Sequence, residues 1–324
     1  MATTWTDQSG YLTNTELSKK FYYSAQPMFK FRQFTDVKTA FGKHSGQTVN
    51  WMRVANLGTY GGTLTETSSM IESSQAYTWG TVTVNELGNS IPFTFKISAL
   101  SKFEIDKIIK QGLRDDMVKC IDGSVEREFN SCALRYVGSS TTTYALTTNG
   151  TATASNTSIL NTYHIRNMML ELKKRNVPGF SSADGDYAMI VSVDAASGLM
   201  GALESIYQYT DTGTKKLLNG EIGRYFGCRF VEDSFASRYT YSASARTATA
   251  KSWAQAQSLD GYMFGAETVQ EIVAVPEEIR MKETTDYGRS NGIAWYMIAG
   301  WKIMWEPSGT GVPDTRIIKW DSAG

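Results

Sequence analysis

The sequence predicts an α+β fold in which long strands project from the body and one long helix runs along it. Three observations predict this class. Apolar and polar residues alternate before residue 98, an apolar residue recurs at every fourth position over residues 104–137, and helix and strand patterns mix from about residue 160. We therefore expect two lobes, one elongated lobe of strands with the long helix and one α/β lobe.

Residues 1–43 combine basic and aromatic side chains and are predicted to form an extended arm. The aromatic residues are Phe21, Tyr22, Tyr23, Phe29, Phe31 and Phe34. Such an arm suits nucleic-acid binding, and it equally suits an arm laid over a neighbouring subunit with its rings in pockets. Both interpretations stay open from the residues alone.

Residues 46–98 are predicted to form a projecting β-arm. Two strands are expected at 47–54 and 77–84, joined by a long Gly/Thr/Ser segment. The residues NELGNS (85–90) are typical of a turn. After them Ile91, Phe93, Phe95 and Ile97 alternate with polar residues, which predicts a half-buried strand.

The apolar stripe over residues 104–137 predicts one long helix. Its members are Ile105, Ile109, Leu113, Met117, Ile121, Val125, Phe129, Ala133 and Val137. Four residues overshoot one helical turn by about 40°, so the stripe winds around the helix and must meet different partners along its length. Gly112 and Gly123 interrupt the helix and are candidate points of bending.

The rest of the chain predicts an α/β lobe and a group of late strands. Exposed loops or hairpins are expected at 139–158 and 237–252. A helix from Thr162 should turn Tyr163, Ile165, Met168, Met169 and Leu172 inward, and a second helix should follow Asp194 as N-cap and carry Leu199, Leu203 and Ile206. Strands are expected at 187–193, within 217–234, and near 261–265, 269–275, 292–305 and 315–320.

Composition limits the classes of function. The chain has 324 residues and a formal net charge of zero, which argues against bulk neutralisation of nucleic-acid phosphates. Its start lacks the layout of a secretory signal, so cytoplasmic synthesis is expected. The apolar run 292–301 is too short for a bilayer, which needs roughly 20 residues, and instead predicts a strand buried on both faces. Cys120, Cys132 and Cys228 form no CxxC pair, so reduced thiols are expected.

No pattern predicts catalysis, a cofactor or a metal. His44 and His164 are isolated from other metal ligands, and His164 is interpreted as a helix-surface residue. GEIGRYFG (220–227) lacks the Lys-Ser/Thr of a phosphate-binding loop, so its glycines are assigned to tight turns. The acidic residues Asp184, Asp186, Asp194, Glu277 and Glu278 fit turns and caps without acid–base chemistry. The sequence therefore predicts a protein that is not an enzyme.

The order of these parts resembles the Hong Kong 97-like fold of tailed-bacteriophage coat proteins. Four segments, GQTVNWMRV (46–54), NGEIGRYFGCRFVED (219–233), YMFGAETVQEIVAV (262–275) and GIAWYMIAGWKIMW (292–305), are similar to major capsid proteins of the phage N-four type. The resemblance implies an N-terminal arm (1–45), an extended β-loop (46–100), a spine helix with peripheral domain (101–138), a mostly axial domain (139–265), and a return to the peripheral domain with C-terminal strands (266–324).

The resemblance also implies partners. Subunits would form hexamers and pentamers of an icosahedral shell around double-stranded DNA, without sequence-specific binding, and the extended loop would lie over a neighbour. A portal protein and separate scaffolding or decoration proteins would join the virion. The predicted subunit interface comprises Phe21, Tyr22, Tyr23, Phe29, Phe31, Trp51, Arg53, Tyr60 and Trp79, and the predicted flex points of the spine helix are Gly112 and Gly123.

Some coat proteins of this fold crosslink themselves through a lysine on the extended loop. Here no lysine lies between Lys43 and Lys96, so we expect no isopeptide crosslinking. Three alternatives stay open: an encapsulin-like nanocompartment around cargo enzymes, a carbohydrate-binding adhesin that uses its aromatic and Thr-rich surfaces, and a hydrolase, against which the missing nucleophile motif counts.

Overall fold

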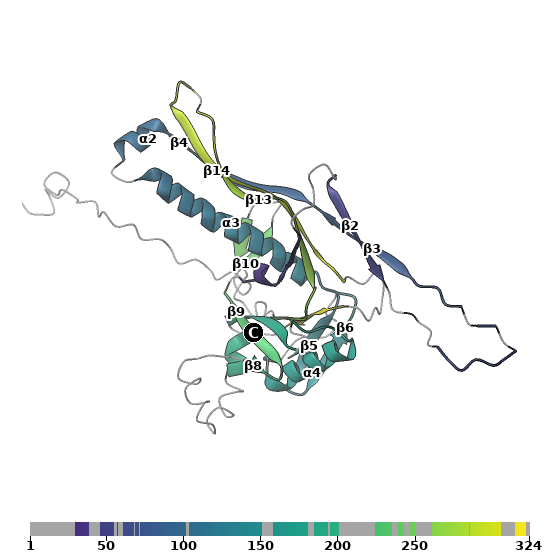
Figure 1. Ribbon diagram of the computed structural model, residues 1–324. Coiled ribbons are helices and arrows are strands. Elements are labelled where there is room, and N and C mark those ends of the chain that lie inside the picture. The colour runs from purple at the N-terminus through teal and green to yellow at the C-terminus, as the bar shows by residue number, and fades with distance from the viewer. Residues whose placement is uncertain are drawn as a thin grey trace, which may run out of the picture.

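The computed structural model describes residues 30–38, 46–54, 57, 61–67, 69–70, 72–101, 104–150, 158–180, 185–193, 195–200, 224–234, 239–242, 247–250, 261–284, 286–305 and 315–321. Two β-sheets and one long helix dominate this part of the chain (Figure 1). A four-stranded sheet with the helix forms an elongated upper body, and a seven-stranded sheet lies below it. The two expected lobes are therefore present.

The four-stranded sheet has the order β1-β13-β14-β4. Its strands are β1 (Asp36–Lys38), β13 (Val269–Met281), β14 (Ser290–Ile303) and β4 (Asn85–Thr94). The central strand β14 pairs antiparallel with both β13 and β4, and none of its residues is exposed. This confirms the strand predicted from the apolar run.

Strand β4 contradicts the turn expected at 85–90. The strand is continuous from Asn85 to Thr94 and pairs with β14 throughout. Gly88 permits this pairing, because a Cβ there would lie 2.7 Å from the Trp295 carbonyl oxygen. The strand also ends earlier than expected, because the short helix α2 (Phe95–Leu100) begins directly after Thr94. Pairing with a neighbouring strand outweighs the local turn preference.

Helix α3 (Ile105–Asn130) confirms the long helix but ends seven residues before the predicted end at residue 137. Ser131 terminates it, because its N–H donates to the carbonyls of Arg127 and Glu128 and its hydroxyl also donates to the Glu128 carbonyl. The chain then enters β5 (Arg135–Ser140), where Val137 is a buried strand residue.

The winding stripe of α3 meets two different hydrophobic clusters, as predicted. Ile109, Leu113 and Ile121 pack against the four-stranded sheet, in a cluster that includes Trp295 and Met297. The residues one and two turns later, Val125 and Phe129, pack instead in a cluster with β12 (Gly261–Phe264) of the other sheet. Helix α3 therefore joins the two sheets.

The seven-stranded sheet has the order β6-β5-β15-β12-β7-β9-β8. Its remaining strands are β6 (Thr143–Thr147), β15 (Ile317–Asp321), β7 (Tyr187–Ser192), β9 (Cys228–Asp233) and β8 (Arg224–Tyr225). Helix α4 (Thr162–Lys174) packs on one face against residues such as Met189 and Val191, and the alternate residues Ala188 and Ile190 face the α3 side. The C-terminal strand β15 belongs to this sheet, whereas β13 and β14 belong to the four-stranded sheet.

Two short hairpins and one helix match their predictions in part. The segment 139–158 contains the β5–β6 hairpin, and β10 (Tyr239–Ser242) pairs with β11 (Thr247–Ala250). Helix α4 begins after Asn161 and buries four of its five predicted inward residues, but Tyr163 is 38% exposed. Residues 195–200 are helical and bury Leu199, whereas Asp194, Leu203, Ile206 and residues 217–223 lie outside the described residues.

Two further expectations concern the whole described chain. All three cysteines are free, and burial raises the pKa of the Cys228 thiol. Among the residues that the structure describes, no helix is both long and apolar enough to cross a bilayer.

Candidate interaction surfaces

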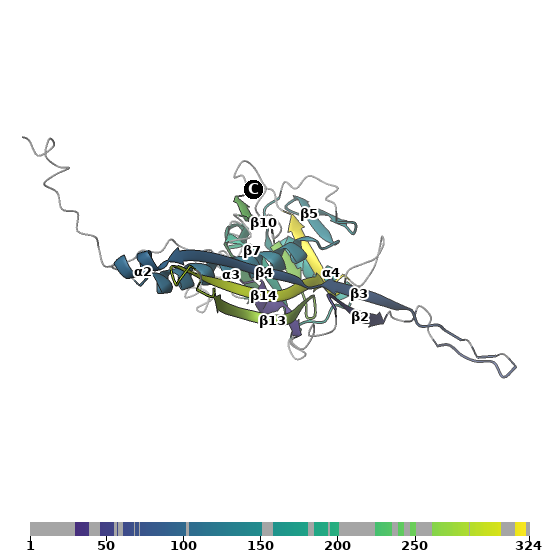
Figure 2. The ribbon, with the colours of Figure 1, turned by 90° about the horizontal axis from the view of Figure 1, so that it is seen from above.

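The hairpin of β2 (Thr48–Val54) and β3 (Tyr77–Thr83) exposes one apolar face. Met52 lies opposite Trp79, and Val54 lies opposite Tyr77, so the four side chains share a face. Trp79 is 69% exposed and Met52 is 55% exposed. Figures 1 and 2 both show the hairpin at one end of the elongated molecule. This face lacks cover from the described chain and is the clearest candidate for contact with a partner.

The other face of the hairpin packs on its own chain. The Trp51 indole lies over Gly80, where an added Cβ would collide with the ring. The indole Nε1 donates to the Met304 carbonyl oxygen at 3.4 Å, and the Arg53 guanidinium lies 5.8 Å from the centre of the ring. Of the interface residues predicted on the hairpin, Trp79 is exposed, Trp51 and Arg53 are half-buried, and Tyr60 lies outside the described residues.

A second apolar surface lies at the opposite end of the molecule, around α2 (Figure 2). Helix α2 buries no residue, and Phe95, Ile97 and Leu100 are all exposed. Ile279 and Met281 are exposed near the end of β13, and Phe95 N–H donates to the Arg289 carbonyl of the β13–β14 turn. The sequence prediction missed this surface, because the same apolar alternation was assigned to a half-buried strand.

The arm residue Phe31 is fully buried within its own chain. Its ring lies 5.5 Å from that of Phe129 and 5.7 Å from that of Tyr262, measured between ring centres. Phe31 therefore has no surface to offer a neighbour, and the interface role predicted for it is wrong. Its apolar ring completes the cluster between α3 and β12 instead. Phe21, Tyr22, Tyr23 and Phe29 lie outside the described residues.

Arg32 fastens the end of the arm to β13. Its guanidinium pairs with the fully buried Glu271 at 2.9 Å and with Glu277 at 3.1 Å. The hydrogen bond from Arg32 lowers the pKa of Glu277. Glu278 pairs with Arg280, and both Glu277 and Glu278 lie within strand β13, so they do not occupy the predicted turn or cap positions.

Asp122 lies on α3 and contacts the turn η1 (Arg32–Phe34), which is at the end of the arm. Its Oδ1 accepts the Arg32 N–H at 2.9 Å, and the N–H groups of Lys30 and Phe31 also bond to the carboxylate. Asp122 is 3% exposed, and no cationic side chain pairs with it in the described chain. Burial, with a smaller contribution from the nearby Asp233, raises the pKa of Asp122 to about 7.

His164 is buried, which contradicts its interpretation as a surface residue. Its Nδ1 lies 3.1 Å from the Tyr136 hydroxyl, and its Nε2 lies 3.1 Å from Ser158 Oγ and 3.0 Å from the Ser140 carbonyl oxygen. Burial lowers the pKa of His164. Ser158 is itself buried and bonds to its neighbour's carbonyl, so this Ser–His contact is enclosed structure rather than a nucleophile open to substrate.

Asp186, a further acidic residue considered for acid–base chemistry, forms an ion pair with Arg229 at 2.9 Å. Within the described ranges, no group of three His, Cys, Asp or Glu side chains is arranged to hold a metal ion. Residues 220–223 of the glycine-rich segment lie outside those ranges.

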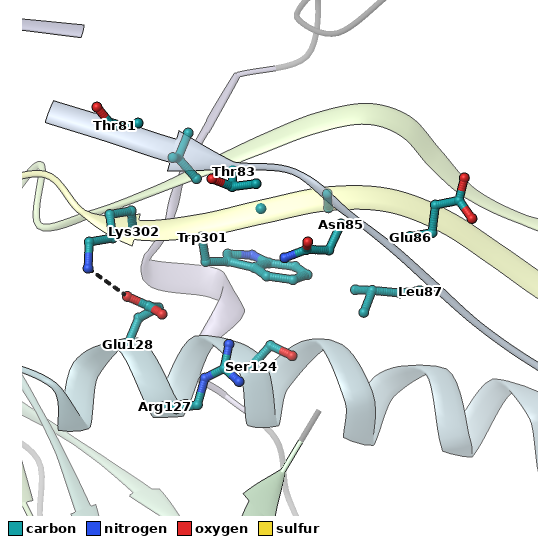
Figure 3. A pocket seen from close by; sticks show the side chains of 13 residues that line it. Thr81, Thr83, Asn85, Glu86, Leu87, Ser124, Arg127, Glu128, Trp301 and Lys302 are labelled. Atoms are coloured by element: carbon teal, nitrogen blue, oxygen red, sulfur yellow. Dashed lines mark ion pairs between the residues drawn. The ribbon is translucent and has the colours of Figure 1, made fainter. Parts of the chain in front are cut away.

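A cavity of about 600 Å³ lies between α3, the base of the hairpin and the central strand β14 (Figure 3). Its polar lining includes Arg127, Glu128 and Lys302, and Trp301 forms part of its wall. Lys302 Nζ lies 3.9 Å from a Glu128 carboxylate oxygen. The indole Nε1 of Trp301 is buried and has no hydrogen-bond acceptor among the described residues.

Comparison with known proteins identifies the fold. Neither a protein-family model nor a curated protein matches the sequence. A chain in the acidic stable capsid structure of Helicobacter pylori bacteriophage KHP30 matches with a TM-score of 0.69 and 15% identity, over 100% of this chain and 99% of its own. A chain of the cyanophage Pam1 capsid matches with a TM-score of 0.71 and 14% identity over 97% of each chain. A cyanophage P-SCSP1u capsid chain gives 0.68 and 10% identity over 98% of this chain and 94% of its own.

The chain has the Hong Kong 97-like capsid fold. In this Hong Kong 97-like chain the two apolar surfaces lie on elements at opposite ends of an elongated molecule. A surface at an end of the molecule can meet a neighbour without obstruction by its own chain. The arrangement therefore favours association between proteins over enclosure of a small molecule.

Proposed function

We propose that the chain is a major capsid protein, a structural subunit that self-assembles into the shell of a tailed bacteriophage and is not an enzyme. The observation that carries the proposal is the extent of the structural likeness. The Hong Kong 97-like fold covers nearly all of this chain and nearly all of several phage capsid chains, so the projecting elements are included in the match. A shared core alone would leave those elements unmatched.

The shell we propose consists of hexamers and pentamers with icosahedral symmetry that enclose double-stranded DNA without sequence-specific contacts. The zero net charge supports a container rather than a protein that condenses DNA. A portal protein, with separate scaffolding or decoration proteins, would complete the virion, and the subunit would be made in the host cytoplasm. In domain terms, the four-stranded sheet with α3 would be the peripheral domain and the seven-stranded sheet the axial domain.

The exposed face of the β2–β3 hairpin is the proposed contact with a neighbouring subunit. Burying one large aromatic side chain such as Trp79 is worth about 2–3 kcal/mol. One such contact is weak, but every subunit of a closed shell takes part in two of them. It contributes its own hairpin to one contact and the surface beneath a neighbour's hairpin to the other. The contacts then act together, and the shell is far more stable than any single interface.

Electron microscopy of the purified protein tests the proposal. Closed shells are expected from the wild type, and a persistent monomer would contradict the function. Packaged DNA and a portal in particles from infected cells would distinguish a virus shell from a nanocompartment, whose particles would hold cargo enzymes instead.

The double variant Met52→Ser with Trp79→Ser tests the hairpin face. It should fold as a monomer and fail to form shells, because the deleted side chains are exposed in the single chain. Leu170→Ser on α4, which removes another partly exposed apolar side chain, is the matched control and should assemble normally. Normal assembly of the double variant would exclude this face as the interface.

A further inference from the structure

The cavity between α3 and β14 is lined by a buried hydrogen-bond donor without an acceptor and by an exposed arginine. Trp301 Nε1 is buried and unpartnered, and an indole N–H can only donate. Arg127 lines the same cavity, is exposed, and forms no ion pair with any residue the structure describes. Figure 3 shows the Arg127 side chain rising from α3 toward the strand that carries Trp301. A buried indole N–H without an acceptor, beside a guanidinium without an ion pair, suits a carboxylate from another molecule.

The carboxylates near the cavity do not supply that acceptor. Glu128 faces Lys302, with which it forms an ion pair. Glu86 lies opposite Ile298 in the sheet register, on the face away from α3, where it bonds to the Tyr296 hydroxyl. Figure 3 shows the Glu86 carboxylate directed away from Trp301 and Arg127. Neither carboxylate is directed at Trp301 or the Arg127 guanidinium, so these two groups are open to a carboxylate from another molecule.

The far end of the hairpin carries carboxylates and no cations. Residues 55–76 contain Glu66 and Glu72 but no lysine or arginine. Both glutamates are exposed. The segment thus carries negative charge that complements the Arg127 guanidinium, and arginine binds carboxylates with two parallel hydrogen bonds.

The glutamates of one chain lie too far from its own cavity. Extended chain spans about 3.3 Å per residue, so the nine residues from Glu72 to Thr81, at the edge of the cavity, cover roughly 30 Å. Figures 1 and 2 both show the hairpin extending away from α3. The carboxylate must therefore come from another molecule. A contact between two different surfaces of identical chains is heterologous, and its repetition about an axis closes a ring.

We propose that Glu66 or Glu72 of a second copy binds in this cavity, with its carboxylate on the Arg127 guanidinium and the Trp301 indole N–H. The inference rests on the proposed shell function and specifies where the hairpin of one subunit meets the next. It assigns the hairpin two attachments, an apolar face near its base and an acidic end. An ionic contact of this kind would hold the loop without a covalent crosslink.

Carbodiimide crosslinking of mixed-isotope shells tests the contact. Shells assembled from equal amounts of nitrogen-14 and nitrogen-15 protein are treated with the reagent, which joins a carboxylate to a nearby lysine, and then digested. Peptides with Glu66 or Glu72 should be linked to peptides with Lys302, and half of these pairs should combine one light and one heavy peptide. The inference would be overturned if every linked pair carried a single isotope, or if both glutamates were linked only to lysines other than Lys302.

Charge variants provide the second measurement. The double variant Glu66→Gln with Glu72→Gln, and separately Arg127→Gln, should raise the protein concentration needed for assembly about tenfold, whereas Glu104→Gln, an exposed carboxylate on another element, should not. Arg127→Glu combined with Glu66→Arg and Glu72→Arg should restore assembly. Unchanged assembly of the Gln variants would refute the contact while leaving the shell function intact. Absence of shells from the wild type would refute the shell function itself.

Discussion

Replacing Asp122 with asparagine is expected to stabilise the unassembled subunit at neutral and alkaline pH and to leave it unchanged near pH 4. The carboxyl group is buried beneath the arm turn η1 with only N–H donors as partners, and its pKa is about 7 in the folded chain against an ordinary value of 3.8. A folded state that binds the proton more tightly is most stable below the ordinary pKa. Its free energy of unfolding then falls as the pH rises toward 7.

The size of the effect follows from the difference between the two pKa values. That difference is roughly three units, and each unit corresponds to about 1.4 kcal/mol, so ionisation costs the folded state about 4 kcal/mol. Asparagine has no charge to bury, and its carbonyl oxygen can still accept the Arg32 N–H. Because its NH₂ group needs a new acceptor, we expect a net gain of about 2–4 kcal/mol at pH 8.

Urea unfolding followed by tryptophan fluorescence between pH 4 and 8.5 measures this effect. The wild type should lose stability across pH 5 to 7, and the Asp122→Asn curve should be flatter over the same range. Asp286→Asn, which removes an exposed carboxylate, is the control and should follow the wild type. Parallel curves for the wild type and Asp122→Asn would show that Asp122 remains ionised in the folded chain, and the reasoning would fail.

Three further substitutions have expected outcomes. Gly80→Ala should destabilise the subunit by about 1–3 kcal/mol in the same urea assay, because the new methyl group displaces the Trp51 ring, and an unchanged midpoint would contradict this packing. His164→Gln should remove a loss of stability below about pH 6.5, because burial lowers the pKa of His164 and the folded chain binds that proton less tightly than the unfolded chain; an identical acid limb in the variant would exclude this source. Gly112→Ala has open space for its methyl group and should add about 0.5–1 kcal/mol, raising the calorimetric Tm by about 1–3 °C. A lower Tm would mean that the helix requires flexibility at Gly112.

The elements that the sequence predicted well are those whose pattern follows from burial within the chain. The stripe from Ile109 to Phe129 has helical spacing because one side of α3 is covered along its whole length. The run around Met297 is apolar because β14 lies between two strands and beneath a helix. Such patterns depend on the period of the secondary structure and on which side of it is buried. Both determine the spacing of apolar residues in the local sequence.

The errors occur where distant residues decide the outcome. Asn85 and Gly88 have turn preferences, but pairing with β14 holds them in a strand. His164 looks like a surface residue on its helix, but Tyr136 and Ser158 enclose it from separate segments. Phe31 belongs to an arm-like sequence, yet the space between α3 and β12 accepts its ring. No local pattern reports a partner that another segment of the chain supplies.

The candidate interaction sites likewise divide into those that the sequence predicts and those that it does not. The exposure of Trp79 could be expected from the projecting hairpin, because period-two strands far from a helix leave one face uncovered. The cavity with Arg127 and Trp301 could not be expected, since the two residues are 174 positions apart and meet only when β14 packs on α3. The acidic character of residues 55–76 is visible in the sequence, but its meaning depends on that cavity.

The position where α3 changes partners favours one of the two predicted flex points. Gly112 lies on the exposed side with open space around it, in the half of the helix whose apolar residues pack on the four-stranded sheet. Gly123 is buried between Ile121, which belongs to that cluster, and Val125, which belongs to the cluster of the seven-stranded sheet. A bend at Gly123 would reorient the two sheets, whereas a bend at Gly112 would only lift the free end of the helix. If the shell expands by bending α3, Gly123→Ala alone should block expansion. Asp122, beside it, would then couple that bend to the seating of the arm.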